Sequence, residues 1–171
     1  AAVFAGSMQP VKKLEWEKMY AAMGIAGVTM PITGEAAVNP LLPSIGLPFT
    51  MCHEMAHRMA IAPERDANLA AFLGCVNHED PQFVYSGYFM AYRYCMNALQ
   101  SVGSGEAAAA AARIATGVNS YFKADIADYN AFFIQYHKEF ASDVANTVND
   151  TFIKVSGDES GVRSYGEVCD L

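Results

Sequence analysis

Residues 53–57 read His-Glu-Met-Ala-His, which places two imidazoles four positions apart and a carboxylate beside the first. In an α-helix, residues at this spacing share one face, so both histidines can reach a single ion. Zinc suits imidazole ligands, and a catalytic zinc takes three protein ligands and one water. The pattern therefore predicts that His53 and His57 bind zinc and that Glu54 acts on the water as general base.

The third ligand must come from farther along the chain. On an uninterrupted helix, Glu64 would face the same way as the histidines but would lie about 10 Å farther along the axis, at 1.5 Å per residue. Pro63 interrupts that helix, because it has no N–H group and disfavours the helical conformation at Ala62. We therefore expect the chain to reverse, and a second helix to bring Glu64 to the metal.

Two neighbours of Glu64 on that second helix can also take part. Asn68 lies four residues after Glu64 on the same face, so its amide can hold the free N–H group of a histidine ligand and fix the tautomer. Asp66 is the alternative third ligand, although an acid in a first helical turn is also typical of dipole stabilisation. More distant alternatives are His78 and Glu35.

Peptide hydrolysis also needs a hydrogen-bond donor for the oxyanion that forms. Four tyrosines recur at helical spacing and can either pack in the core or supply this donor; they are Tyr85, Tyr88, Tyr92 and Tyr94. The sequence does not choose among them.

Prolines and glycines mark the helices that must position these residues. Helices are expected over residues 10–24, from residue 48 through the histidines, and over residues 63–76. Further helices are expected over residues 81–100, in the alanine run 107–112 and over residues 125–155, where apolar residues recur every three or four positions. The sequence thus predicts a mainly α, multi-helix domain.

A short β element is expected ahead of the histidine helix. Glycines, β-branched residues and a proline over residues 28–39 indicate one or two irregular strands. Such a strand can offer its edge to an extended peptide, in which case proline at Ala37 should abolish activity.

Composition limits the class of protein and its partners. A chain of 171 residues fits one domain, over residues 1–171, with 53% apolar and 17% charged residues. The net charge of −7, with scattered basic residues, argues against a nucleic-acid partner. No apolar run reaches the roughly 18–20 residues of a membrane-spanning helix. The four cysteines, Cys52, Cys75, Cys95 and Cys169, are expected to be free thiols, with a Cys75–Cys95 bridge left open.

Several stretches together resemble a known family, from about residue 14 to the end of the chain. They are "ITGEAAVN", "LPFTMCHEMAH", "ERDAN", "DPQFVYSGYFMA" and "VNDTFIKVSGDESGVRSYG". They are similar to an uncharacterised bacterial family, a domain of unknown function, of predicted membrane-anchored HExxH zinc-dependent peptidases. The resemblance implies transmembrane helices in a segment preceding this fragment, a catalytic domain outside the cytoplasm, and a peptide or protein substrate.

More distantly, the HExxH motif followed by "ERDAN" resembles the gluzincin metallopeptidases. This resemblance implies a zincin-like fold, with Glu64 as the third zinc ligand and Asn68 supporting a ligand. The chain departs from the family pattern at Ala60, where glycine is usual, and at Asp66, where glutamate is usual. If residue 60 requires a positive φ, alanine strains the turn by about 1 kcal/mol.

The function predicted from these residues is zinc-dependent hydrolysis of peptide bonds. Two alternatives keep the metal but not the chemistry: a zinc-containing peptide-binding or sensing module, and an enzyme that has lost catalysis and only binds peptides. Replacing Glu54 with glutamine separates them, because only a peptidase loses turnover while it retains zinc.

Overall fold

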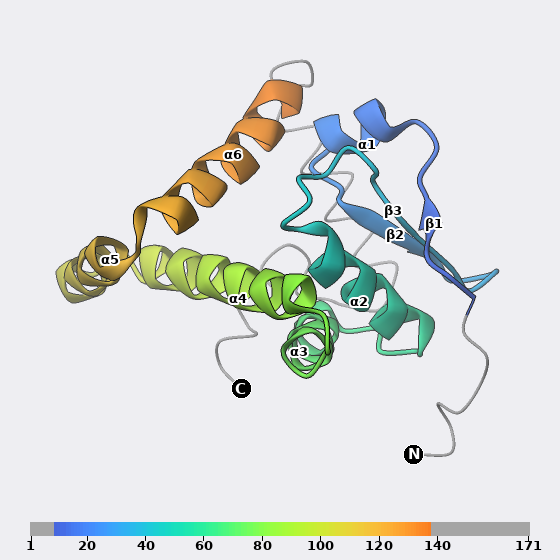
Figure 1. The fold of residues 1–171 in the computed structure, drawn as a ribbon, viewed down its shortest axis with the longest axis horizontal. Helices are drawn as coiled ribbons and strands as arrows, with labels where there is room; N and C mark the ends of the chain where they lie inside the picture. Colours follow the sequence, from blue (N-terminus) through green and yellow to red (C-terminus); the bar gives the residue numbers. More distant parts are fainter. Residues whose placement is uncertain (1–8, 138–171) are drawn as a thin grey trace.

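The computed structural model describes residues 9–137, which form a helical body with a small sheet on one side (Figure 1). In chain order the elements are β1 (Lys12–Lys13), α1 (Glu17–Ala22), β2 (Gly27–Met30), β3 (Glu35–Val38), α2 (Leu47–Arg58), α3 (Glu64–Val76), α4 (Pro81–Ser101), α5 (Gly105–Gly117) and α6 (Ser120–His137). The prediction of a mainly α fold with a short β element ahead of the histidine helix is confirmed.

The sheet has three strands in the order β1-β3-β2. β1 runs parallel to β3, and β2 runs antiparallel to it, with Val28 opposite Ala37. Ala37 also pairs with Lys12, so it lies in the central strand. The expectation that Ala37 tests an edge strand is therefore wrong, because proline there would break the sheet itself; within the described residues β2 is the edge on that side.

The helix expected over residues 10–24 begins late. Its first part is instead β1, and the backbone N–H of Leu14 donates to the carbonyl of Val38 at 2.9 Å. Trp16 precedes α1 with a φ of 57°, which ends the extended segment and starts the helix. Pairing with β3 thus overrides the local helical preference of this segment.

The later helices follow the prolines and glycines closely. α2 contains the histidines, α3 begins at Glu64 directly after Pro63, and α4 starts at Pro81, where the side chain of Asp80 accepts from the N–H of Gln82. The alanine run lies in α5. Of the helix expected over 125–155, α6 contains residues 125–137; the remainder and the segment after it lie outside the described residues.

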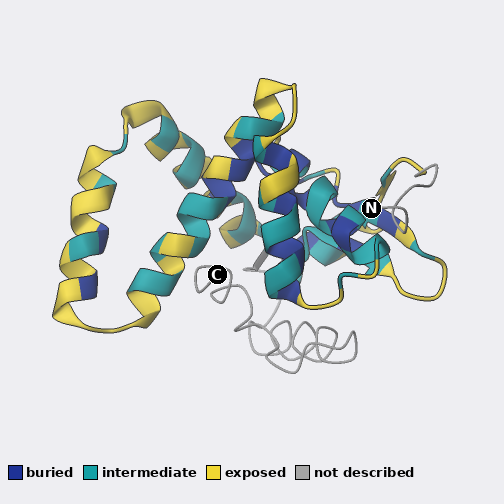
Figure 2. Ribbon diagram, turned by 90° about the horizontal axis from the view of Figure 1, so that it is seen from below, coloured by how far each residue is buried: buried dark blue, intermediate teal, exposed yellow. Residues whose placement is uncertain are grey.

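The hydrophobic core forms where α2, α3, α4 and α6 meet. Its buried members are Leu42, Phe49, Ala71, Cys75, Phe89, Met90 and Tyr129. A Cβ atom on Gly87 of α4 would lie 2.8 Å from Cβ of Cys75, so glycine permits the close approach of α3 and α4. Figure 2 shows this burial along the ribbon, with α5 mostly exposed. The helices that carry the predicted ligands are thus held by the core.

Three of the four cysteines lie in the described residues, and all three are free thiols. Cys75 is buried, and its hydrogen-bond partner is Cys52, not Cys95, so the bridge to Cys95 left open by the sequence is not formed. Cys169 lies outside the described residues. Within residues 9–137, no helix is both long enough and apolar enough to cross a bilayer.

The reversal between α2 and α3 depends on one left-handed residue. Ala60 has a φ of 66°, and its N–H donates to the carbonyl of His57 at 2.9 Å. The N–H of Ile61 donates to the carbonyl of Ala56 at 3.1 Å. This pair of hydrogen bonds is a Schellman motif, which normally has glycine at the left-handed position. Residue 60 therefore has the positive φ at which alanine, in place of glycine, strains the turn.

Replacing Ala60 with glycine should stabilise the protein. Glycine removes a steric penalty of about 1–2 kcal/mol from the folded state, but its greater conformational entropy stabilises the unfolded state by about 0.5–1 kcal/mol. We therefore expect the free energy of unfolding to rise by about 0.5–1 kcal/mol. Urea unfolding followed by circular dichroism measures this. Ala62→Gly is the control, because Ala62 has no positive φ; it should destabilise. A loss of stability in Ala60→Gly would contradict the strained turn.

Candidate metal centre

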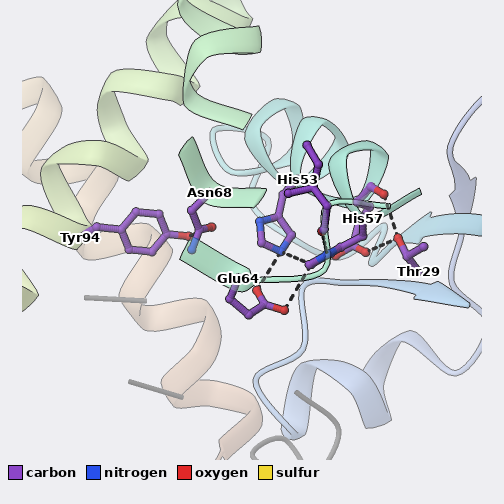
Figure 3. A network of polar contacts seen from close by, with 8 residues as sticks. Thr29, His53, His57, Glu64, Asn68 and Tyr94 are labelled. Carbon is purple, nitrogen blue, oxygen red and sulfur yellow. Dashed lines mark hydrogen bonds and ion pairs between the residues drawn. The ribbon is translucent and has the colours of Figure 1, made fainter. Parts of the chain in front are cut away.

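The reversal brings the three predicted ligand side chains together. Nε2 of His53 lies 3.1 Å from Oε2 of Glu64, and Nε2 of His57 lies 3.2 Å from Oε1 of the same carboxylate. The two Nε2 atoms are 3.0 Å apart. Figure 3 shows the two imidazoles, from α2, and the carboxylate, from α3, converging on one point.

This donor set fits a zinc ion. Tetrahedral ligands at about 2.0–2.1 Å from zinc stand about 3.3 Å from one another, close to the separations in this cluster. The side chains are 12%, 15% and 9% exposed for His53, His57 and Glu64, so they are shielded but still open on one side. Among the described residues, these three form the group of metal-ligating side chains that could hold an ion.

The end of α2 orients one of the ligands. Nδ1 of His57 lies 2.9 Å from the carbonyl oxygen of Ile61, which can only accept. Nδ1 therefore carries a proton, so in the neutral imidazole the lone pair lies on Nε2, the nitrogen that faces the cluster. The Schellman motif that reverses the chain thus also orients the ring of a candidate metal ligand.

The electrostatics of the cluster favour positive charge at its centre. Burial opposes ionisation of Glu64, but hydrogen bonds from His53 and His57 outweigh it and lower the pKa of Glu64 to about 2. Burial likewise disfavours the charged form of His57, yet the hydrogen bond and negative charge of Glu64 raise its pKa. A carboxylate that stays ionised between two imidazoles is suited to a divalent cation.

Glu54 is placed by strand β2. Glu54 is only 4% exposed, and its Oε2 accepts from the hydroxyl of Thr29 at 2.7 Å; that hydroxyl also lies 2.8 Å from the backbone oxygen of Glu54. A Cβ atom on Gly27 would lie 2.6 Å from Oε1, so only glycine leaves room for this position. Burial raises the pKa of Glu54, although His53 and Thr29 act to lower it. A raised pKa suits a group that must take up a proton.

Asn68 lies on α3 one turn after Glu64, as its spacing predicts, and the structure adds that it is fully buried. Its Oδ1 accepts from the hydroxyl of Tyr94 at 3.3 Å. Its Nδ2 and the Nδ1 of His53 are buried and have no hydrogen-bond partner among the described residues. The hydrogen bond predicted between the Asn68 amide and the free N–H group of a histidine therefore stays a prediction.

The structure does not bring the alternative ligands to this cluster. Asp66 is paired with Arg65, at 3.1 Å from its Nε. His78 is exposed, where its Nδ1 accepts from the N–H of Asp80 and its ring stacks on Phe83. Glu35 is exposed and paired with Lys12. Asp66, His78 and Glu35 are therefore not part of the group formed by His53, His57 and Glu64.

Of the four tyrosines that the sequence left open, only Tyr94 is among the described residues that line the cavity containing the ligands. The hydroxyl of Tyr85 donates to Asp125 at 2.5 Å. Tyr88 is exposed and Tyr92 packs against Phe122. Tyr94 is therefore the candidate hydrogen-bond donor from this set.

Sequence reasoning missed the residues that place the predicted ones. Thr29 and Gly27 contact Glu54 across a helix–sheet interface, and the Ile61 carbonyl contacts His57. No spacing rule connects a strand residue to a helix 25 positions later, so only the three-dimensional arrangement reveals Thr29.

Comparison with known proteins assigns the chain to a family. Residues 1–171 match the family described as "Protein of unknown function (DUF3810)". The chain belongs to this family. No curated protein and no solved structure matches the chain. Membership of a family of unknown function was expected from the motifs; the description assigns no activity, so the chemistry of this DUF3810 chain has to be inferred from its site.

Loss of one ligand carboxylate should weaken zinc binding strongly. We expect Glu64→Gln to lower zinc affinity by at least about 100-fold, since a neutral amide replaces a charged ligand. Competition with a chromophoric chelator measures the affinity. Asp66→Asn is the matched control, because Asp66 lies in the same helical turn but outside the cluster. Equal affinity in the two variants would exclude Glu64 as a ligand.

Proposed function

We propose that this DUF3810 chain is a zinc-dependent metallopeptidase of gluzincin type, in which His53, His57 and Glu64 bind the ion and Glu54 is the general base. The observation that carries the proposal is the convergence of three ligand side chains beside a buried, separately anchored carboxylate. A purely structural zinc site needs four protein ligands, whereas the cluster in the described residues supplies three.

When bound there, zinc would supply a Lewis acid that polarises the scissile carbonyl and lowers the pKa of a water to about 7. The remaining steps belong to the protein. The carboxylate of Glu54, held by the hydroxyl of Thr29 at Oε2, would take the proton of the attacking water. Glu54 then delivers the proton to the leaving amine. Tyr94, on the wall of the same cavity, is the proposed donor to the oxyanion, for which its hydroxyl would turn away from Asn68.

The proposed substrate is a peptide or protein in extended conformation. β2 is an edge of the sheet within the described residues and lines the cavity next to the ligands. Backbone pairing with β2 would align a peptide across the site, as edge strands do in other peptide-binding proteins.

We also propose that residues 1–171 form one domain of a bacterial membrane-anchored protein, held by segments outside this sequence, with the domain on the extracytoplasmic side. The support is the resemblance of its motifs to membrane-anchored HExxH peptidases. A nucleic-acid partner is not proposed, because the net charge is −7.

Glu54→Gln should abolish peptide cleavage and leave zinc binding intact. Removal of a general base lowers kcat by about 100- to 10,000-fold. A peptide-library digest followed by mass spectrometry, with metal content measured in parallel, checks both effects, and a chelator should stop cleavage by the wild type. Glu79→Gln, at an exposed turn, is the control. A wild-type protein that binds peptides and zinc without cleaving them would favour the binding or sensing module.

Thr29→Val should lower kcat by about tenfold or more with little change in KM. The variant keeps the shape of the side chain but removes a hydrogen bond to a charged group, a loss of about 1.5–3 kcal/mol. Thr29→Ser keeps the hydroxyl and should retain most of the activity. Steady-state kinetics on one cleaved peptide compares the two. If both variants behave alike, Thr29 does not act through its hydroxyl.

A further inference from the structure

The metal cluster opens into a cavity far larger than a zinc ion and a water require. Its volume is about 780 Å³, within the range of about 300–1,000 Å³ typical of sites that bind organic ligands. His53, His57, Glu64 and Glu54 lie on its wall. The cavity therefore has room for a substrate side chain in addition to the peptide bond that would lie at the metal.

Most of the remaining wall is apolar and comes from elements distant in sequence. Its large side chains include Met19 of α1, Met23 directly after α1, Phe49 of α2, Met90 of α4, and Tyr129 and Phe133 of α6. Phe49, Met90 and Tyr129 are buried, so this wall is continuous with the hydrophobic core. Methionine side chains adapt to different apolar shapes, so the wall favours bulky apolar groups without selecting one.

Few charged side chains line this cavity. Among the described lining residues, the charged side chains are Glu54, Glu64 and Arg58. Arg58 is the last residue of α2, and its Nη1 donates to the carbonyl of Gln9 at 2.5 Å. A charged substrate group placed against the apolar wall would lose hydration without gaining a partner.

We propose that this cavity is a specificity site that accepts a bulky apolar side chain, such as leucine or phenylalanine, next to the scissile bond and rejects acidic and basic ones. The inference rests on the proposed peptidase function, since it takes the occupant to be a peptide substrate. The physical basis of this selectivity does not depend on the cleavage chemistry. Burial favours apolar side chains, and loss of hydration without a new partner disfavours charged ones.

Binding to a protein that cannot cleave separates the two proposals. Fluorescent peptides that differ only at a central residue (Leu, Phe, Asp or Lys) are titrated into zinc-loaded Glu54→Gln protein. We expect Kd for the Leu and Phe peptides to be at least about tenfold lower. Equal affinity, or preference for a charged peptide, would overturn the inference. Apolar preference without any cleavage by the wild type would support the cavity and contradict the peptidase.

A charge introduced on the wall should remove this preference. In the same Glu54→Gln background, Met23→Glu should weaken binding of the Leu peptide about tenfold and improve binding of the Lys peptide. Met30→Glu, at a cavity residue that is 50% exposed and so tolerates the change, is the second variant. Ile114→Glu, on α5 away from the cavity, is the control. Circular dichroism confirms folding; unchanged preference in both cavity variants contradicts the proposal.

Discussion

The hydrogen bond between His57 and the carbonyl of Ile61 joins the backbone reversal to the chemistry of the site. The carbonyl is available because the Schellman motif ends α2 at a left-handed Ala60. The same reversal allows α3 to start at Glu64 and to direct its carboxylate at both imidazoles. A helix that continued past Ala60 would separate the ligands, so the arrangement of the cluster depends on this turn.

The other side of the site depends on the sheet. β2 holds the carboxylate of Glu54 through the hydroxyl of Thr29 and leaves space for it at Gly27. The core formed by α2, α3, α4 and α6 holds the helices that carry these residues and supplies part of the apolar wall of the cavity. The proposed ligands come from helices packed in that core, whereas the proposed base is adjusted by a strand.

The features that were predictable from sequence are local ones. Residue spacing identified His53, His57 and Glu64, and Pro63 marked the break that brings them together. A positive φ at Ala60 was considered because the residue stands where the resembled family usually has glycine. Non-local pairing explains the failures: β1 forms because β3 is beside it, and Ala37 became central for the same reason. Thr29 could not be found, because its contact with Glu54 depends on how a strand packs against a helix.

Anomalous diffraction at the zinc absorption edge, from crystals of the zinc-loaded protein, tests the central claim most directly. We predict one strong peak bonded to Nε2 of His53, Nε2 of His57 and the carboxylate of Glu64, at about 2.0–2.2 Å from each. A peak coordinated by other residues, or no peak while the Glu64 side chain points into solvent, would contradict it.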